Sequence, residues 1–353
     1  MPELSFNHNL IQHVLASRSR TDTSLTNTPF AHTLTSGILK AAEVLSVFIM
    51  LIYTHENCVA HEVPKGHPER PDRLVHLLKH LKETGVTDDF PLKSSPKITG
   101  AQVNNAHGSR YFFSLEEKKP DEGLEALDPD TWMSPRSLDA AEYAAGAVWQ
   151  GVNDVIGGID QRVFCAVRPP GHHAEYDSPM GFCLLNSVAI AAINALEIPG
   201  ISKVAILDFD VHHGNGTVDL CKDNPNILVC SSFQHPFYPG RLHDINRPNI
   251  VNTPLPSGTA GNAFRHGITQ DWWPAIHAHQ PDLILLSAGF DGHKDDPLAQ
   301  FQLIEDDYYW ITQEIVALAN QYAQGRIVSA LEGGYNLQAL GTSVVAHLEA
   351  LKA

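Results

Sequence analysis

The sequence predicts an α/β protein in which a mostly parallel sheet carries helices on both faces. Short apolar runs rich in β-branched residues alternate with longer segments of helical periodicity between residues 163 and 331, as in chains built from β-α-β units. The runs are almost continuously apolar, which is typical of strands buried on both sides. Each run ends in glycines and polar residues, and open α/β sheets bind their ligands beyond the carboxyl ends of their strands.

One domain is predicted over residues 50–353, because this part of the chain shows neither an internal repeat nor a linker. Residues 1–49 are rich in Ser, Thr, Asn and His and have little periodicity, so a poorly structured N-terminal extension is expected there. The apolar run over residues 44–53 is only ten residues long, too short to cross a bilayer. It leads into the first predicted strand without a small-residue cleavage site, and a cytoplasmic location is therefore expected.

The first half of the domain is predicted to hold one strand, over residues 50–55, and two helices. The first helix lies between residues 69 and 85, because leucines recur there at helical spacing and Gly85 ends the pattern. These leucines are Leu74, Leu77, Leu78 and Leu81. Residues 88–130 are rich in proline and charge and predict loops around a short element, and an Ala-rich second helix follows over residues 137–157.

The second half alternates strands and helices. Strands are predicted over residues 163–167, 204–207, 227–230, 283–286 and 327–331. Helices are predicted over residues 186–196, 262–279 and 306–322. A long loop is predicted from residue 231 to about residue 258.

Composition narrows the classes of function. The formal net charge of −16 argues against binding to a nucleic-acid backbone and favours cationic partners, such as lysine-rich peptides or polyamines. The five cysteines form no CxxC pair, and three of them lie in apolar or strand-like contexts that indicate buried structural thiols. A reducing compartment is therefore expected. Neither a GxxxxGK[ST] loop nor a GxGxxG turn is present, so phosphate and dinucleotide chemistry has no support.

One stretch, residues 203–217 (KVAILDFDVHHGNGT), concentrates candidate metal ligands. The apolar run ends in two carboxylates and two imidazoles within six residues, namely Asp208, Asp210, His212 and His213. Asp210 and His212 are two positions apart, so on an extended chain their side chains point to the same side. This spacing predicts a two-residue grip on one metal ion, whereas the alternative is an acidic loop without a ligand.

Four more predicted strands end in similar chemistry. The strand over residues 163–167 is followed by RPPGHHAE (168–175), and the later strands by Ser231-Ser232, by SAGFDG (287–292) and by EGGY (332–335). Parallel strands would bring all five ends to one edge of the sheet. This convergence predicts a metal-dependent active site.

Asp291 is the candidate third ligand, because it follows a neighbouring strand. Two aspartates and one histidine leave coordination positions open for water and substrate, as in catalytic sites. Because two carboxylates offset the charge of the metal, such a site needs a separate general base, and the adjacent His172 and His173 are candidates. Tyr335 follows two glycines and could stabilise an oxyanion, although a tyrosine packed on a loop is an equal alternative.

Asp208 lies two residues before Asp210 and on the same side of an extended chain. It could bind a second ion, or it could orient one of the histidines through a carboxylate–imidazole hydrogen bond. Asn215 lacks the charge for that role but can still accept a hydrogen bond.

The chain resembles the histone deacetylase superfamily, in particular its class II and bacterial deacetylase-like branch, in six motifs that occur in order. They are HPERPDRL (67–74), RPPGHHA (168–174), GFCLLNSVAIAA (181–192), LDFDVHHGNGT (207–217), SAGFDGHKDDPL (287–298) and LEGGYN (331–336). The resemblance extends from about residue 50 to the C-terminus. It implies the arginase/deacetylase fold, a three-layer α/β architecture with a mostly parallel sheet of about eight strands.

Carried over residue by residue, the resemblance implies a zinc site and a structural potassium site. Zinc would be bound by Asp210, His212 and Asp291, beside the catalytic residues His172, His173 and Tyr335. Asp208 would support His172 and, with Ser231, contribute to the potassium site. Class I enzymes have a carboxylate at the position of Asn215, so the protonation state of His173 is left open.

The resemblance also implies a tunnel for an acyl-lysine side chain. Phe182 and Tyr238 would form its aromatic walls, and Asp130 would hold the substrate backbone at the rim. The implied reaction is zinc-dependent hydrolysis of the amide of N-acetyl-lysine in proteins or peptides, which releases lysine amine and acetate. Zinc would polarise the carbonyl and acidify the attacking water. His173 would take its proton, Tyr335 would stabilise the oxyanion, and a histidine imidazolium would protonate the leaving amine.

Acetylpolyamine hydrolysis is the main alternative, because some members of the family act on small acetylated amines. Those members place a glutamate after the Asp-Pro that follows the third metal ligand, and here that position is Leu298. A neutral leucine offers no attraction to a second cationic amine, which favours acyl-lysine.

A binuclear manganese ureohydrolase and a non-catalytic acyl-lysine-binding protein have less support. The ureohydrolase needs a further aspartate two residues beyond the histidine of an Asp-x-His motif, where this chain has Gly214. The non-catalytic protein would be favoured by loss of a metal ligand, a tandem histidine or Tyr335, and all of these are present. The sequence leaves the oligomeric state and the physiological substrate open.

Overall fold

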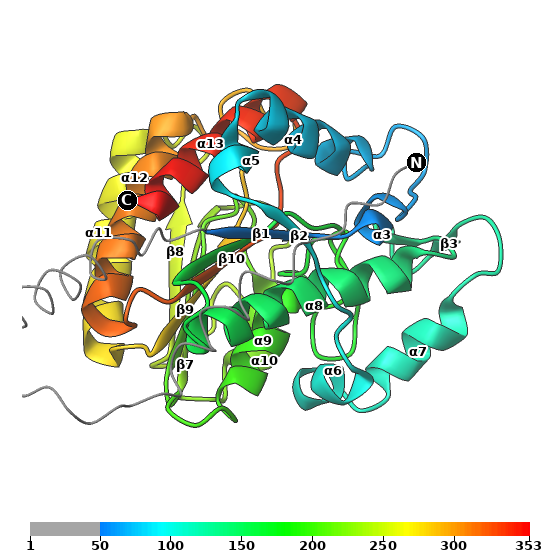
Figure 1. Cartoon of the computed structure of the whole chain (residues 1–353), viewed down its shortest axis with the longest axis horizontal. Helices are drawn as coiled ribbons and strands as arrows, with labels where there is room; N and C mark the ends of the chain where they lie inside the picture. The colour runs from blue at the N-terminus through cyan, green and yellow to red at the C-terminus, as the bar shows by residue number, and fades with distance from the viewer. Residues whose placement is uncertain (1–49) are drawn as a thin grey trace, which may run out of the picture. The chain divides into compact units, whose positions relative to one another are not determined.

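A computed structural model describes residues 50–353, so the extension predicted over residues 1–49 lies outside the described residues. The described chain forms a three-layer α/β fold around an eight-stranded sheet in which every strand pair is parallel (Figure 1). Across the sheet the strands are β2 (Leu92–Ser94), β1 (Leu51–Thr54), β5 (Arg162–Cys165), β10 (Ile327–Leu331), β9 (Leu283–Ala288), β6 (Val204–Asp208), β7 (Ile227–Gln234) and β8 (Ile250–Leu255). The predicted fold class is confirmed.

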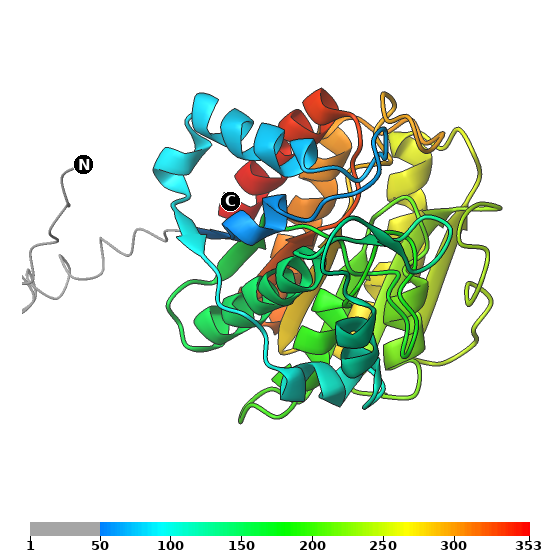
Figure 2. The same cartoon turned by 90° about the vertical axis from the view of Figure 1, so that its right-hand side faces the viewer.

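Helices cover both faces of the sheet (Figures 1 and 2). One layer contains α8 (Ser137–Ile156), α9 (Ser187–Ala195) and α10 (Asn215–Cys221), and the other contains α4 (Asp72–Glu83), α11 (Gly261–His279), α12 (Glu305–Tyr322) and α13 (Leu337–Lys352). Shorter helices are α3 (Glu56–Val59), α5 (Val86–Asp89), α6 (Gly100–Ala106) and α7 (Tyr111–Lys118). At Gly151 a Cβ atom would lie 2.9 Å from Val328, so a glycine lets α8 approach the sheet closely.

The central strands are apolar because helices bury them from both sides. All six residues of β9 and all five of β6 are buried, and each large aliphatic side chain removed from water contributes about 1.5–3 kcal/mol. The sequence pattern therefore predicted these two strands to within a residue or two. They place Asp208 and Ser287 side by side at the carboxyl end of the sheet.

The predictions for two long loops were wrong, because each contains an edge strand. Residues 88–130 include β2 together with α6, α7 and β3 (Glu125–Ala126), which pairs with β4 (Trp132–Met133). The predicted loop after residue 230 contains the rest of β7 and the whole of β8. β2 is short and exposed, and β8 contains Asn252 and Pro254, so neither has the apolar run that marks a central strand.

The structure also shows the state of the cysteines and the character of the helices. The cysteines are free thiols, and all five are buried, whereas burial was predicted for three. Within residues 50–353, no helix combines the length and the apolar character that crossing a membrane requires. The cytoplasmic location stays a prediction.

A buried ion network joins the start of the domain to the strand ends. The helix predicted from residue 69 begins only at Asp72, and Glu69 lies ahead of it with no exposed surface. Its carboxylate accepts hydrogen bonds from Nε and Nη2 of Arg168 at 2.6 and 2.7 Å and from Nη1 of Arg73 at 3.0 Å. Burial disfavours the charged carboxylate, but Arg168, a hydrogen bond from His61 and Arg73 together outweigh it and hold the pKa of Glu69 well below its usual range.

Replacing Glu69 by Gln tests this network. The variant leaves two buried guanidinium groups without their shared anion, so the free energy of unfolding is expected to fall by about 3–5 kcal/mol at pH 7 in urea denaturation. The matched control is Glu83→Gln, which removes an exposed ion pair with Lys79 and is expected to change stability by less than about 1 kcal/mol. Equal losses in the two variants would contradict the role given to Glu69.

Candidate metal centre and active site

The five strand ends singled out in the sequence converge on one edge of the sheet. β5, β10, β9, β6 and β7 are consecutive neighbours and all run in the same direction. In the register of the sheet, Asp208 on β6 lies between Ser231 on β7 and Ser287 on β9. The loops after these strands therefore deliver their polar side chains to a common site, as predicted.

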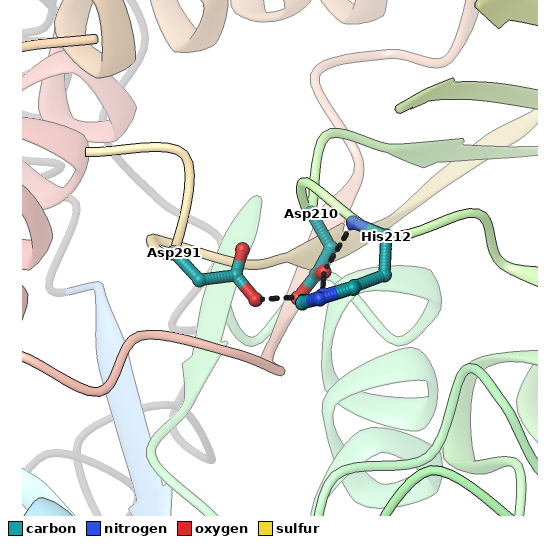
Figure 3. Close-up of side chains that lie close together, drawn as sticks. All are labelled: Asp210, His212 and Asp291. Carbon is teal, nitrogen blue, oxygen red and sulfur yellow. Dashed lines mark hydrogen bonds and ion pairs between the residues drawn. The ribbon is translucent and has the colours of Figure 1, made fainter. Parts of the chain in front are cut away.

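Asp210, His212 and Asp291 come together at this edge (Figure 3). Their candidate ligand atoms lie within 4.8 Å of one another, and all three residues are buried. Among residues 50–353, this is the only group of three or more His, Cys, Asp or Glu side chains with that geometry. The loops after β6 and β9 bring the three residues together across the sheet.

The backbone between Asp210 and His212 differs from the prediction. β6 ends at Asp208, and residues 210–212 form a bend rather than an extended strand. Hydrogen bonds to the candidate ligand carboxylates hold this bend. The N–H of His212 donates to Asp210 Oδ1 at 2.9 Å, and the N–H of Val211 donates to Asp291 Oδ1 at 3.0 Å. These two hydrogen bonds fold the backbone around the carboxylates, and the side chains of Asp210, His212 and Asp291 therefore converge.

The spacing of the three ligand atoms fits a small divalent ion. His212 Nδ1 lies 3.1 Å from Asp210 Oδ1 and 3.1 Å from Asp291 Oδ2 (Figure 3). A tetrahedral ion with bonds of about 2.0–2.1 Å separates its ligands by about 3.3 Å. Burial opposes a charged imidazole, but the two carboxylates raise the pKa of His212 to about 10. A positive charge is therefore favoured between these carboxylates, and a metal ion can supply it.

The tandem histidines sit in opposite electrostatic environments. Nδ1 of His172 lies 2.9 Å from Asp208 Oδ2, so the hydrogen bond expected between Asp208 and a histidine is present. Burial opposes charging of His172, but Asp208 and Asp210 hold its pKa well above the usual range. Burial and the neighbouring His172 hold the pKa of His173 well below the usual range. Within the tandem pair, the surroundings thus favour the charged form of His172 and the neutral form of His173.

The second oxygen of Asp208 accepts a hydrogen bond from the N–H of Asp210 at 3.1 Å. Ser231 is its neighbour in the sheet, and the hydroxyl of Ser231 accepts from the N–H of Gly214 at 3.3 Å. The potassium site expected at Asp208 and Ser231 stays a prediction.

Tyr335 lies on the loop between β10 and α13. Its backbone N–H donates to Asp296 Oδ2 at 2.6 Å, and the guanidinium of Arg73 lies 4.8 Å from the centre of its ring. Burial raises the pKa of Tyr335 well above its usual range, although the charge of Arg73 acts in the opposite direction. Tyr335 therefore remains a neutral phenol, able to donate a hydrogen bond.

A cavity of about 180 Å³ borders His212 and the tandem histidines. Its lining contains Asp130, Pro170, His172, His173, Gly181, Phe182, His212, Phe237, Tyr238, Leu298, Gly333 and Tyr335. The four residues predicted to contact substrate, Asp130, Phe182, Tyr238 and Leu298, therefore border the same cavity as the tandem histidines and Tyr335. Burial and the Asp128 carboxylate raise the pKa of Asp130 to about 6.

Sequence reasoning missed several residues that shape this site. Phe237, the neighbour of Tyr238, lines the cavity with its ring stacked 5.4 Å from that of His212. Glu332 accepts the backbone N–H groups of Gly171 and His172 at 2.6 and 3.2 Å. Phe237 lies beside Tyr238, and Glu332 belongs to the EGGY segment noted in the sequence, but the sequence alone indicated a role for neither residue.

Comparisons with known proteins identify relatives. Residues 67–351 match the model of the Histone deacetylase domain. An uncharacterized protein of Synechocystis sp. is 39% identical over 315 residues, which cover 86% of this chain and 99% of that protein. Histone deacetylase 14, chloroplastic, of Arabidopsis thaliana is 35% identical, with 85% of this chain and 76% of that protein covered. The crystal structure of the HDA15 HD domain is similar at a TM-score of 0.81 and 32% identity, over 87% of this chain and 89% of that chain.

Replacing Gly333 by Ala tests the convergence of the carboxylates. A Cβ atom there would lie 2.1 Å from Asp291 Oδ2 and 2.6 Å from Asp210 Oδ2, so the two side chains must move apart. Affinity for Zn²⁺ or Co²⁺, measured by competition with a chromogenic chelator, is expected to fall about 10–100-fold. Gly100→Ala, where the new Cβ makes only ordinary contacts at 3.7 Å, is the control. Unchanged affinity in Gly333→Ala would show that these carboxylates do not bind the ion.

Proposed function

The chain belongs to the histone deacetylase family, and on that premise we propose that it is a zinc-dependent hydrolase that deacetylates N-acetyl-lysine in peptides or proteins. One observation carries the proposal: the cluster of Asp210, His212 and Asp291 borders, through His212, a cavity that is also lined by His173 and Tyr335. These are the groups that amide hydrolysis needs, namely a metal site, a base and an oxyanion donor.

Zinc would be held by Asp210, His212 and Asp291, whose spacing suits tetrahedral coordination. Bound there, it would act as a Lewis acid towards the acyl carbonyl and the attacking water. The backbone N–H of Gly333 donates to Asp210 Oδ2 at 2.9 Å and keeps that carboxylate oriented. Potassium at Asp208 and Ser231 is part of the same proposal, as a structural ion.

The protein side chains would carry out the proton transfers. His173 is neutral and lines the cavity, so it suits a general base that accepts a proton from water as the water oxygen attacks the acyl carbon. Tyr335 would donate its hydroxyl proton in a hydrogen bond to the developing oxyanion. As the C–N bond breaks, the proton held by His173 would pass to the leaving lysine amine, while His172 stays charged.

The cavity wall supports acyl-lysine as the substrate. Phe182 and Tyr335 pack edge to face with ring centres 5.9 Å apart, and the ring of Tyr238 lies edge-on to His173 at 5.3 Å. Aromatic faces suit the methylene chain of lysine, which carries no charge once acylated. Leu298 provides no charge for the second amine of a polyamine. Acetylpolyamine hydrolysis is the alternative substrate class, and a non-catalytic acyl-lysine-binding protein is the alternative without chemistry.

The binuclear ureohydrolase alternative receives no support from the site. A second metal would need a further cluster of ligands, and residues 50–353 contain only the cluster of Asp210, His212 and Asp291. A Cβ atom at Gly214 would lie 2.1 Å from Asp208 Oδ2 and 3.6 Å from His172 Nδ1, so a bridging aspartate has no room there.

The first test compares two substrates of the zinc-loaded protein. An acetyl-lysine peptide is expected to be hydrolysed with a higher kcat/KM than a matched N-acetylated polyamine, because Leu298 offers no charge to a second amine. Tyr335→Phe is expected to reduce kcat by about 10²–10³-fold, since it removes one oxyanion donor.

Tyr309→Phe, at an exposed tyrosine of α12, is the control and is expected to retain full activity. Preference for the polyamine would overturn the substrate assignment while keeping the chemistry. Absence of turnover with either substrate, in protein shown to contain zinc, would favour the binding-module alternative.

Metal removal is the second test. Treatment with a chelator is expected to abolish peptide deacetylation, and one equivalent of Zn²⁺ is expected to restore it. Asp291→Asn should weaken zinc binding and activity together, because it removes one charged ligand. Asp295→Asn, on an exposed side chain nearby, should change neither. Full activity in chelator-treated protein that contains no metal by elemental analysis would disprove the metal dependence.

A further inference from the structure

A buried carboxylate outside the proposed mechanism lies directly behind His173. Glu175 is 6% exposed, and its Oε1 atom lies 2.7 Å from Nδ2 of Asn215. Asn215 is fully buried, and its Oδ1 atom lies 2.6 Å from Nδ1 of His173. The three side chains therefore form a line from Glu175 through the Asn215 amide to His173.

The surroundings of Asn215 allow only one orientation of its amide. Nδ2 faces three acceptors: Oε1 of Glu175 at 2.7 Å, the sulfur of Met180 at 3.2 Å and the carbonyl of His173 at 3.4 Å. Turning the amide over would place its oxygen against the Glu175 carboxylate, and an ionised carboxylate has no proton to donate. Nδ2 must therefore face Glu175, and Oδ1 must face His173.

The orientation of the amide decides which nitrogen of His173 carries the proton. Because Oδ1 of Asn215 only accepts, the neutral imidazole must donate from Nδ1. Its lone pair is then on Nε2, which has no hydrogen-bond partner among residues 50–353 and belongs to a ring that lines the cavity. A base needs its lone pair on the side of the reacting water.

We propose that Glu175 is a positioning residue that fixes the Asn215 amide and thereby holds His173 in the tautomer with its proton on Nδ1 and its lone pair towards the cavity. This inference rests on the proposed function only for its catalytic consequence. Asn215 contacts the proposed base directly, and Glu175 supplies a carboxylate on the other side of the Asn215 amide.

A second contact keeps Glu175 in place. Its Oε2 atom lies 2.9 Å from Nη2 of Arg241, a residue that follows Phe237 and Tyr238 on the loop bordering the cavity. The backbone of Glu175 is anchored separately, because its carbonyl accepts from Nδ1 of His107 at 2.9 Å. A role limited to tethering this loop is the alternative, and it would depend on Arg241 as much as on Glu175.

Three variants separate the two roles in zinc-loaded protein. Glu175→Leu is expected to lower kcat about 10–100-fold with little change in KM, because the amide loses its orienting acceptor while the cavity wall is kept. Arg241→Met removes the ion pair but leaves Oε1 in place, so kcat should stay within about threefold of wild type. Glu175→Leu combined with Asn215→Asp is expected to regain about tenfold in kcat over Glu175→Leu, since either oxygen of a carboxylate can accept from His173.

Nitrogen-15 NMR of the histidine side chains provides a readout independent of turnover. In wild type the His173 signals, assigned by comparison with His173→Gln, should show the tautomer protonated on Nδ1, and Glu175→Leu should show a mixture or the opposite tautomer. The proposal is overturned if the tautomer is unchanged in Glu175→Leu, if Arg241→Met loses as much activity, or if the double variant folds but regains nothing. The tautomer change without turnover by wild type would retain the positioning role and reject the proposed function.

Discussion

The buried ion network of Glu69 is the constraint on which the rest of the site depends. Arg73, one of its two guanidinium partners, also donates to the carbonyl oxygens of Glu332 and Gly334 at 2.6 and 2.7 Å. Those carbonyls belong to the loop that carries Tyr335. Breaking the pair of Glu69 and Arg73 would leave buried charges without a partner, at a large cost in free energy. The pair therefore holds the segment before α4 against the loop after β10. A phenol donor is useful only if its position is determined in this way.

Four acidic side chains lie close together at the carboxyl edge of the sheet. Asp208, Asp210, Asp291 and Glu332 are all buried at the carboxyl ends of neighbouring strands. Burial and mutual repulsion raise the pKa values of Asp291 and Glu332 to about 7. Burial of carboxylates at this density costs free energy that a cation can recover. The same residues that make the site costly for the apo-protein would favour the divalent ion proposed there, and binding of that ion would then increase the stability of the fold.

Different polar side chains orient the two tandem histidines. Asp208 contacts His172 directly and keeps it charged, whereas Asn215 contacts His173 and leaves it neutral. Adjacent histidines thus acquire different properties because one has an anion behind it and the other has an amide. The two ends of an amide differ, unlike the two oxygens of a carboxylate. Glu175 accepts from the nitrogen of Asn215 and so keeps the amide oxygen facing the ring of His173.

The sequence by itself determined the central strands, the parallel sheet and the identity of the candidate ligands. Continuous apolar runs such as β6 and β9 are typical of strands covered on both faces, and Asp210, His212 and Asp291 follow such runs closely. Only the tertiary structure decided the edge strands β2 and β8, whose residues are less buried and carry no periodic signal. It also decided the bend at residues 210–212 and the contacts of Glu69, Glu175 and Phe237. These depend on hydrogen bonds and packing between segments far apart in the chain, which no local pattern of residues encodes.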